Sequence, residues 1–260
     1  MNFLLGADPE LFVTKEGRFL SAFGLIEGDK ARPKKVDKGA VQVDGMALEF
    51  NIDPATNKRE FVNNIQAVMS TLREMVPEYN LTVVPTAHFG AEYIEAQPNK
   101  AKELGCDPDF NAYTGLENIK PDEALPFRTG AGHVHVGWTE DERGDVHNDM
   151  CRLLVKELDV ILGLPSLILD TDVTRRKMYG QAGAYRVKPY GVEYRVLSNF
   201  WIKSEHLIEF VYQGVSRAIL NLSEGNPLHE KYDVETIINS NDIEKAMKII
   251  EEHNLLGGMG

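Results

Sequence analysis

Two periodicities of apolar residues divide the chain into candidate strands and helices. Residues 2–14 and 17–24 are rich in apolar β-formers and flank a short turn that contains a glycine, which predicts an opening hairpin. Residues 40–52 alternate polar and apolar side chains around Gly45, which predicts one bent strand or a pair of strands. Over residues 56–78 the apolar positions recur at three- and four-residue steps, as in a helix that packs on a sheet.

The rest of the chain continues this mixture of strands and helices. Residues 91–128, rich in Pro, Asn, Asp and Gly, predict a long irregular excursion, and Pro165 is expected to break or restart a helix. Strands and helices do not alternate regularly, so the order favours an α+β fold, with an antiparallel sheet and helices packed on one face. The other face of such a sheet can stay open to a polar site. We expect the further strands at 81–90, 130–138 and 191–202, and the further helices at 145–162, 204–222 and 234–252.

Pairs of polar residues two positions apart occur in four of the predicted strands. Side chains alternate across a strand, so both members of a pair lie on one face and their apolar neighbours lie on the other. A single pair is typical of a solvated strand face, whereas four pairs indicate a shared, mostly acidic surface that suits Mg2+ or Mn2+. Pro9 lies inside the first pair and cannot donate to a sheet ladder, so we expect it at an edge or at a strand start. The pairs are Asp8 with Glu10, Glu49 with Asn51, His133 with His135, and Glu193 with Arg195.

The stretch that precedes Glu193 is locally basic. It contains Arg175, Arg176, Arg186 and Lys188. In a chain this acidic, such a stretch fits an anionic partner, and it also fits a charged loop that is paired with neighbouring acids.

Length, charge and cysteine content narrow the class of protein. A chain of 260 residues suits a single domain over 1–260, and a net charge of -12 without a basic run argues against binding to the phosphate backbone of a nucleic acid. Cys106 and Cys151 lack the spacing of a zinc site or of a disulfide framework, and we expect Cys106 to be a small buried loop residue rather than a nucleophile. We find no export signal and no membrane span, so we expect a cytoplasmic protein without a membrane partner. A P-loop motif and a G-x-S-x-G elbow are both absent from the sequence.

Several ordered motifs together resemble a known family. GADPELF, DGMALEFN, GCDPDFNAY, GHVHVGW and YGQAGAYRVKPYGVEYRVLSNFW are similar to the phage-type COOH-NH2 ligases, relatives of glutamate-cysteine ligase and glutamine synthetase. The resemblance runs from about Gly6 to Trp201. It implies a glutamine synthetase catalytic-domain-like fold whose open sheet face binds ATP and Mg2+ or Mn2+. It also implies an ADP-forming ligase that joins a carboxylate to an amine through an acyl phosphate.

The resemblance assigns expected roles to the polar residues. Asp8 is a shorter acid than the Glu that glutamate-cysteine ligases usually carry at that position. For Asp44 the resemblance leaves two roles open: a further metal ligand, or a group that holds the substrate amine. The implied metal ligands are Asp8, Glu10, Glu49, His133 and Glu193. The implied catalytic residues are His135, which reaches phosphate or substrate, with Arg186 and Arg195, which steady the phosphoryl group. The expected substrate-binding residues are Asp44, Asn51, Arg175, Arg176 and Lys188.

Other functions remain open at the level of sequence. A guanidino-kinase-like phosphotransferase would stop at a phosphorylated product, a non-catalytic phage protein would bind only nucleotide or peptide, and a metal-dependent hydrolase would have no need for nucleotide. For the ligase, we expect amino acids or peptides as substrates, no nucleic-acid partner, and a location in the cytoplasm of a bacterial host or phage-infected cell. Oligomer formation is left open.

Overall fold

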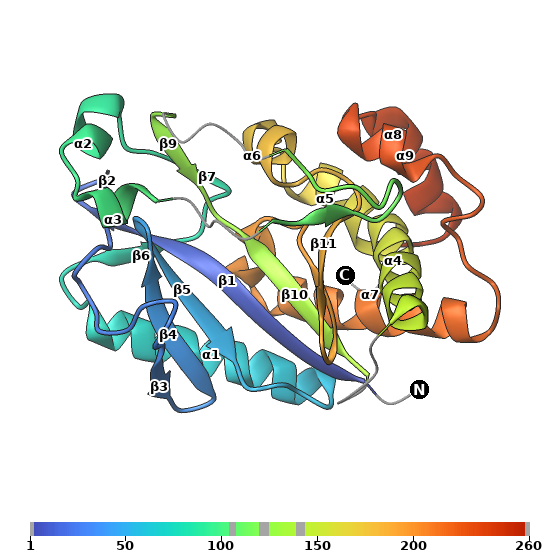
Figure 1. The fold of residues 1–260 in the computed structure, drawn as a ribbon, viewed down its shortest axis with the longest axis horizontal. Helices are drawn as coiled ribbons and strands as arrows, with labels where there is room; N and C mark the ends of the chain where they lie inside the picture. The colour runs from blue at the N-terminus through green and yellow to red at the C-terminus, as the bar shows by residue number, and fades with distance from the viewer. Residues whose placement is uncertain (1–2, 104–107, 120–124, 139–143, 258–260) are drawn as a thin grey trace.

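The fold is built on one large antiparallel sheet (Figure 1). The computed structural model describes residues 3–103, 108–119, 125–138 and 144–257. In the ten-stranded sheet the order is β3-β4-β5-β1-β10-β12-β11-β8, with β2 and β6 also paired to β1, and β7 and β9 form a separate two-stranded sheet. The strands are β1 Leu4–Lys15, β2 Arg18–Leu20, β3 Lys34–Val36, β4 Gly39–Asp44, β5 Ala47–Ile52, β6 Asn80–Thr82, β7 Thr86–His88, β8 Phe110–Asn111, β9 Phe127–Thr129, β10 Gly132–Gly137, β11 Ala184–Lys188 and β12 Gly191–Tyr194.

The longer helices cover one face of this sheet. In Figure 1, α1 runs behind β4 and β5, and α7 lies behind the strands that come next in the sheet order, around β10. The α-helices are α1 Lys58–Met75, α2 Ala91–Glu95, α3 Asn99–Lys102, α4 Asp145–Leu158, α5 Leu164–Leu169, α6 Val173–Met178, α7 Glu205–Ser223, α8 Val234–Asn239 and α9 Ile243–Glu252. A π-helical turn at Asp159–Gly163 and a 3-10 turn at Asn199–Lys203 complete them. The expected α+β class with an antiparallel sheet is therefore confirmed.

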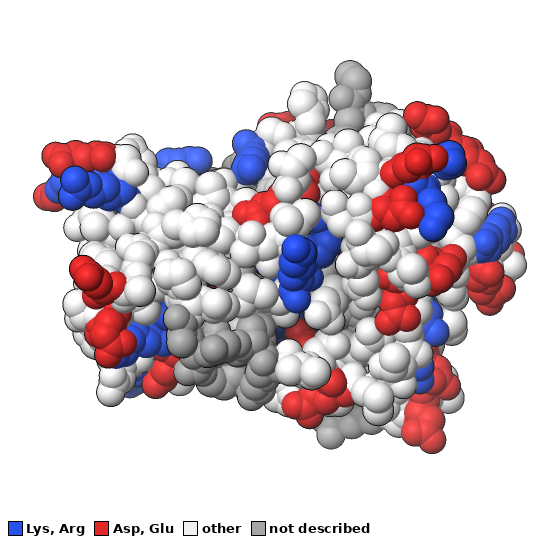
Figure 2. Space-filling model, turned by 90° about the horizontal axis from the view of Figure 1, so that it is seen from above, with Lys and Arg blue, Asp and Glu red and all other residues white. Residues whose placement is uncertain are grey.

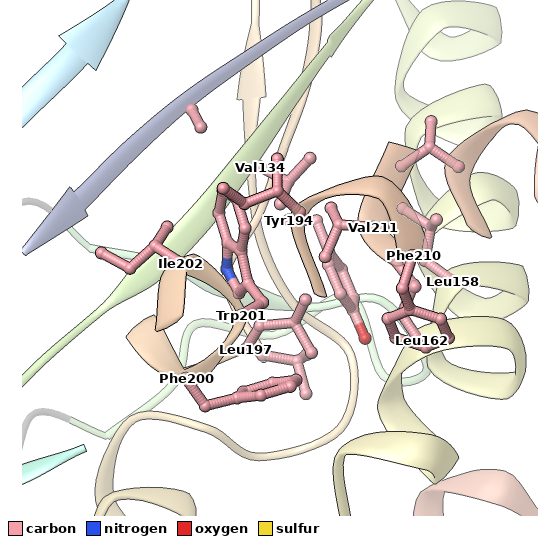
Figure 3. Packing of buried hydrophobic residues seen from close by; sticks show 14 of the residues in the cluster. Val134, Leu158, Leu162, Tyr194, Leu197, Phe200, Trp201, Ile202, Phe210 and Val211 are labelled. Atoms are coloured by element: carbon pink, nitrogen blue, oxygen red, sulfur yellow. The ribbon is translucent and has the colours of Figure 1, made fainter. Parts of the chain in front are cut away.

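The hydrophobic core lies between the sheet and these helices. Leu5 and Leu11 of β1 are fully buried, as are Phe61 and Ile65 on the apolar side of α1. Figure 3 shows the large side chain of Trp201 in the same buried cluster as residues from β10, β12 and α7. Burial of apolar side chains on this face of each strand leaves the alternate, polar side chains on the opposite face.

Turn residues divide two elements that the periodicity predicts as continuous. Residues 81–90 form two strands in different sheets, because Pro85 lies between β6 and β7 and cannot donate to a ladder. The helix expected at 234–252 is split into α8 and α9, because Asn241 adopts a left-handed φ of 54° that ends the first helix.

The second half of the chain also departs from the expected elements. The strand expected at 191–202 ends at Tyr194, and its remainder forms the loop and 3-10 turn that place Trp201 in the core. The helix at 145–162 continues as the π-helical turn and then as α5, so Pro165 restarts the helix rather than breaking it. The irregular excursion at 91–128 contains the short elements α2, α3, β8 and the start of β9.

Pro9 lies in the interior of the sheet, not at an edge. Its strand, β1, pairs with β10 on one side and with β5 on the other. The Glu10 N–H donates to Ala131 O on the β10 side, and successive N–H groups alternate sides, so the nitrogen of Pro9 faces β5. The register with β5 begins only at Glu10, so proline costs no ladder hydrogen bond at this position.

Candidate active site

The strand register brings the predicted polar pairs onto one face. Asp8 lies opposite His133, and His135 lies opposite Glu193. On the other side of β1, Glu10 lies directly opposite Glu49. The four strands β5, β1, β10 and β12 are neighbours, so the pairs form one continuous polar surface, as the spacing predicts.

A cleft of about 1120 Å3 lies over this surface. It is lined by residues between Phe3 and Arg195, including Lys30 and Arg128, which the strand spacing does not single out. The predicted site residues that line it are Asp8, Glu10, Asp44, Glu49, Asn51, His133, His135, Arg175, Arg186, Lys188, Glu193 and Arg195. Arg176 does not line the cleft.

Asp8, His135 and Glu193 form a group suited to a metal ion. One potential ligand atom from each lies within 4.8 Å of those of the other two, and His135 Nε2 is 3.1 Å from Asp8 Oδ2. Within the described residues, Asp8 Oδ1 and His135 Nε2 are buried and make no hydrogen bond. His135 Nδ1 lies 2.6 Å from the hydroxyl of Tyr190, so donation from Nδ1 would leave the Nε2 lone pair available to a metal. The donor types and the unsatisfied buried atoms fit Mg2+ or Mn2+.

This group contains His135 where the resemblance implies His133. The Nδ1 atom of His133 lies 3.4 Å from Asp8 and 3.5 Å from Glu193, but it is also 3.3 Å from Arg195 Nη1. Burial and the Arg195 guanidinium lower the pKa of His133 to about 4. A permanent cation against this nitrogen disfavours a divalent ion at the same atom, so Nε2 of His135 is better placed for a metal than Nδ1 of His133.

The charges of Asp8 and His135 support each other. Burial raises the pKa of Asp8, but the nearby imidazoles of His135 and His133 lower it more, so the pKa lies well below its usual range. Burial lowers the pKa of His135, and the Asp8 carboxylate raises it by more, so the net change is upward. Asp8 is therefore ionised at neutral pH and available as an oxygen ligand.

A second group of acids lies on β1, β4 and β5. Burial and the Asp44 carboxylate raise the pKa of Glu10 to about 7. Burial together with the charges of Asp8, Glu10 and Asp44 raises the pKa of Glu49 well above its usual value, and burial also raises the pKa of Asp44. The hydrogen bonds from Gln42 Nε2 to Glu49 (2.6 Å) and from the Ala131 N–H to Glu10 (2.7 Å) offset part of this cost. These acids carry a charge excess that a bound cation would relieve.

The opposite wall of the cleft is basic. Glu193 is paired with Arg195, lies 3.5 Å from Arg186 Nη1, and lies 2.7 Å from Lys188 Nζ. Burial and the charge of Asp8 raise the pKa of Glu193, but the charges of His133, Arg195 and His135 lower it by more, so the net pKa is about 2. Arg195 is held in turn by Asp109, with Nε 3.0 Å from the carboxylate. This wall therefore offers positive groups to an anion that enters the cleft.

The two neighbouring arginines of α6 have different surroundings. Arg175 lines the cleft, although Nη1 and Nη2 donate to the carbonyl oxygens of Val196 and Arg195. Arg176 points into the interior, where Nη2 donates to the carbonyls of Ser166 and Asp170. Arg176 is thus placed to join α5 and α6, and the expectation that it binds substrate is not supported by its position.

Two residues of the site escape the period-two argument. Tyr190, in the turn before β12, contacts His135, and Asp109, just before β8, contacts Arg195. Both occur in the quoted family motifs, but neither is one member of an alternating strand pair. Only the motif match could have drawn attention to them. Cys106 lies outside the described residues, so its expected role stays a prediction.

Comparison with known protein families gives a match over part of the chain. The family described as phage phiEco32-like COOH.NH2 ligase-type 2 matches residues 119–224. The resemblance to the phage-type COOH-NH2 ligases is confirmed. The match supports a carboxylate-amine ligase in general, that is, an enzyme that forms carbon–nitrogen bonds. No curated protein gives a significant match to the chain.

The ligase match covers only one side of the cleft. It includes His133, His135, Lys188, Glu193 and Arg195, whereas the acids of β1, β4 and β5 precede it. These acids enter the site through the register of β1 with β10 and β5.

Acidic and basic side chains both lie on the face of the molecule that Figure 2 shows. In Figure 2, acidic side chains gather at the end of the molecule formed by α8 and α9, with Lys and Arg interspersed among them. Among the described residues, no helix combines the length and apolar character needed to cross a bilayer.

Proposed function

We propose that this carboxylate-amine ligase is ATP-dependent and ADP-forming, with an amino acid or peptide as the acid and an amine as the acceptor. The observation that carries the proposal is the division of one cleft into an acidic wall and a basic wall, on the segment that matches the ligase family and the strands paired to it. We further propose a glutamine synthetase catalytic-domain-like fold and a location in the cytoplasm of the bacterial host or phage-infected cell.

Divalent metal has a suitable set of ligands in this cleft. Asp8, His135 and Glu193 would hold one Mg2+ or Mn2+, and Glu10 with Glu49 would hold another. Bound metal would offset the negative charge of phosphoryl oxygens during transfer. These residues supply oxygen ligands and an imidazole, which both ions accept.

The basic wall supports transfer of a phosphoryl group. Arg195 and Arg186 present guanidinium groups toward the space in front of Glu193, where they would stabilise the charge that spreads over the phosphoryl oxygens. The γ-phosphoryl group of ATP passes to the carboxylate of the acid substrate, which gives an acyl phosphate and ADP. The amine then attacks the acyl carbon, so the amide forms, phosphate leaves, and one proton is released from the ammonium.

The acidic wall supports binding of the amine. Asp44 lines the cleft on β4, where its side chain is close to Glu49. A carboxylate there attracts the substrate ammonium and can take up its proton during attack, which a raised pKa favours. Arg175, at the edge of α6, would bind the carboxylate of the acid substrate.

The test is release of phosphate from ATP with Mg2+ or Mn2+ over pools of amino acids and short peptides, with mass spectrometry of the products. The ligase requires ADP and phosphate release that depends on both an acid and an amine, with a product lighter than their sum by one water. A phosphorylated product without an amide would indicate a guanidino-kinase-like phosphotransferase. Metal-dependent nucleotide binding without turnover in any pool would indicate a non-catalytic binding protein.

A further inference from the structure

Glu193 is a buried carboxylate with a cation at each oxygen. Its side chain is 2% exposed. Oε1 contacts Arg195 Nη1 and lies 3.5 Å from Arg186 Nη1, whereas Oε2 lies 2.7 Å from Lys188 Nζ. A divalent ion that takes Glu193 as a ligand must therefore approach an oxygen that a positive group already occupies.

The three cations differ in how firmly they are held. Asp109 fixes Arg195 through Nε at 3.0 Å, and the carbonyl of Pro108 accepts from Arg186 Nε at 3.2 Å. Lys188 has one ion pair among the described residues, the contact with Glu193, and its side chain is 30% exposed. An ammonium on a flexible four-carbon stem can turn away from Glu193 with little change elsewhere.

The direction in which Lys188 can turn is set by its strand. Lys188 and Arg186 lie two positions apart on β11, so both side chains point to the cleft face of the sheet. The backbone of Lys188 is held on the other side by His147, whose Nε2 lies 2.9 Å from Lys188 O. The stem is thus anchored at the rim of the cleft, while the ammonium remains movable.

We propose that Lys188 is a displaceable counter-ion of Glu193, which neutralises this carboxylate in the empty cleft and turns to the phosphates of a nucleotide when a divalent cation binds beside Glu193. The proposal rests on the proposed function, because it needs both a metal ion and a nucleotide in this cleft. It goes beyond that function by giving Lys188 opposite effects on two ligands: it opposes the free metal and favours the metal–nucleotide complex.

The test measures two affinities for each variant. Free Mn2+ is followed by its electron paramagnetic resonance signal, first with the protein alone and then with a non-hydrolysable ATP analogue. For Lys188→Met we expect free Mn2+ to bind at least about 5-fold tighter and the Mn2+–analogue complex at least about 5-fold weaker, as coupling of this kind requires. Lys188→Arg keeps the charge and should bind free Mn2+ no more tightly than the wild type does.

A matched surface variant controls for the change in net charge. Lys248 makes an equally short pair with Glu244, 2.7 Å, on the exposed side of α9, so Lys248→Met should change neither affinity. If Lys188→Met leaves both affinities unchanged, or shifts both in the same direction, the counter-ion proposal is wrong while the ligase proposal stands. If the wild type binds neither Mn2+ nor the analogue, both proposals are wrong.

Discussion

Glu10 on β1 and Glu49 on β5 lie directly opposite each other in the sheet, with both carboxylates on the cleft face. Like charges in this relationship destabilise an antiparallel pair. The pKa of Glu10 is raised to about 7, and that of Glu49 is raised well above its ordinary value. The metal-free protein therefore stores a repulsion here that a bound cation or a neutral residue would remove.

Glu49→Gln should stabilise the metal-free protein in a pH-dependent way. Between the unfolded pKa near 4.5 and the folded value of about 7 for Glu10, the native state keeps a proton that the unfolded state has lost, so stability falls as pH rises through this window. The gain from Glu49→Gln should thus be small at pH 5 and about 2–4 °C in Tm at pH 8, as ~1 kcal/mol gives in a chain of this size. Thermal melts with a chelator measure it. The exposed Glu74→Gln is the control, and a gain at pH 5 equal to that at pH 8 would contradict the explanation.

The two histidines of β10 should contribute differently to the affinity for a metal ion. Among the described residues, His135 Nε2 makes no hydrogen bond and lies 3.1 Å from Asp8 Oδ2, whereas His133 Nδ1 faces Arg195. We expect His135→Gln to weaken Mn2+ binding at least ~10-fold, the size of effect typical of altered metal shells, and His133→Gln to change it less than about 3-fold. Titration of free Mn2+ decides between them. If His133→Gln weakened Mn2+ binding more than His135→Gln, the result would support the roles that the family resemblance implies.

Arg195 should contribute to the chemical step, with Asp109 as its positioning residue. Arg195→Ala removes a guanidinium from the basic wall, so we expect turnover to fall ~100-fold or more. Asp109→Asn loses the charge that holds Arg195 Nε and should cost about 10-fold, but nothing further when it is combined with Arg195→Ala. Steady-state kinetics of the four proteins measure this coupling. Additive losses in the double variant would show that Asp109 acts independently, and the exposed Asp149→Asn should have no effect.

Arg176 and Arg175 should affect different properties. Arg176→Met removes the side-chain donor to the carbonyls of Ser166 and Asp170, so we expect a loss of about 2–4 kcal/mol in the free energy of unfolding and an unchanged KM in the folded fraction. Arg175→Lys should raise the KM for the acid substrate, because it replaces the planar guanidinium at the cleft with an ammonium, which cannot bind a carboxylate through two parallel hydrogen bonds. Urea unfolding and steady-state kinetics test the two variants. A raised KM for Arg176→Met would support the expectation that this residue binds substrate.

The amino-acid sequence by itself determined which side chains share a face. Alternation is a local property of each strand, so the spacing of Asp8 with Glu10 or of His133 with His135 sufficed to place each pair away from the core. The same reasoning gave the α+β class and the long helix α1, because apolar periodicity is also local. The family motifs supplied the kind of chemistry.

Only the tertiary structure decided which of these residues meet. The order β5-β1-β10-β12 comes from hydrogen bonding between distant segments and from packing on the core, which no local spacing encodes. That register places Glu10 against Glu49. Contacts from the turn at Tyr190 and from Asp109 then distinguish His135 from His133 and orient Arg195. Arg176 lies in the same basic stretch as Arg175, yet the direction of α6 turns it into the interior, because a helix sends adjacent residues to different sides.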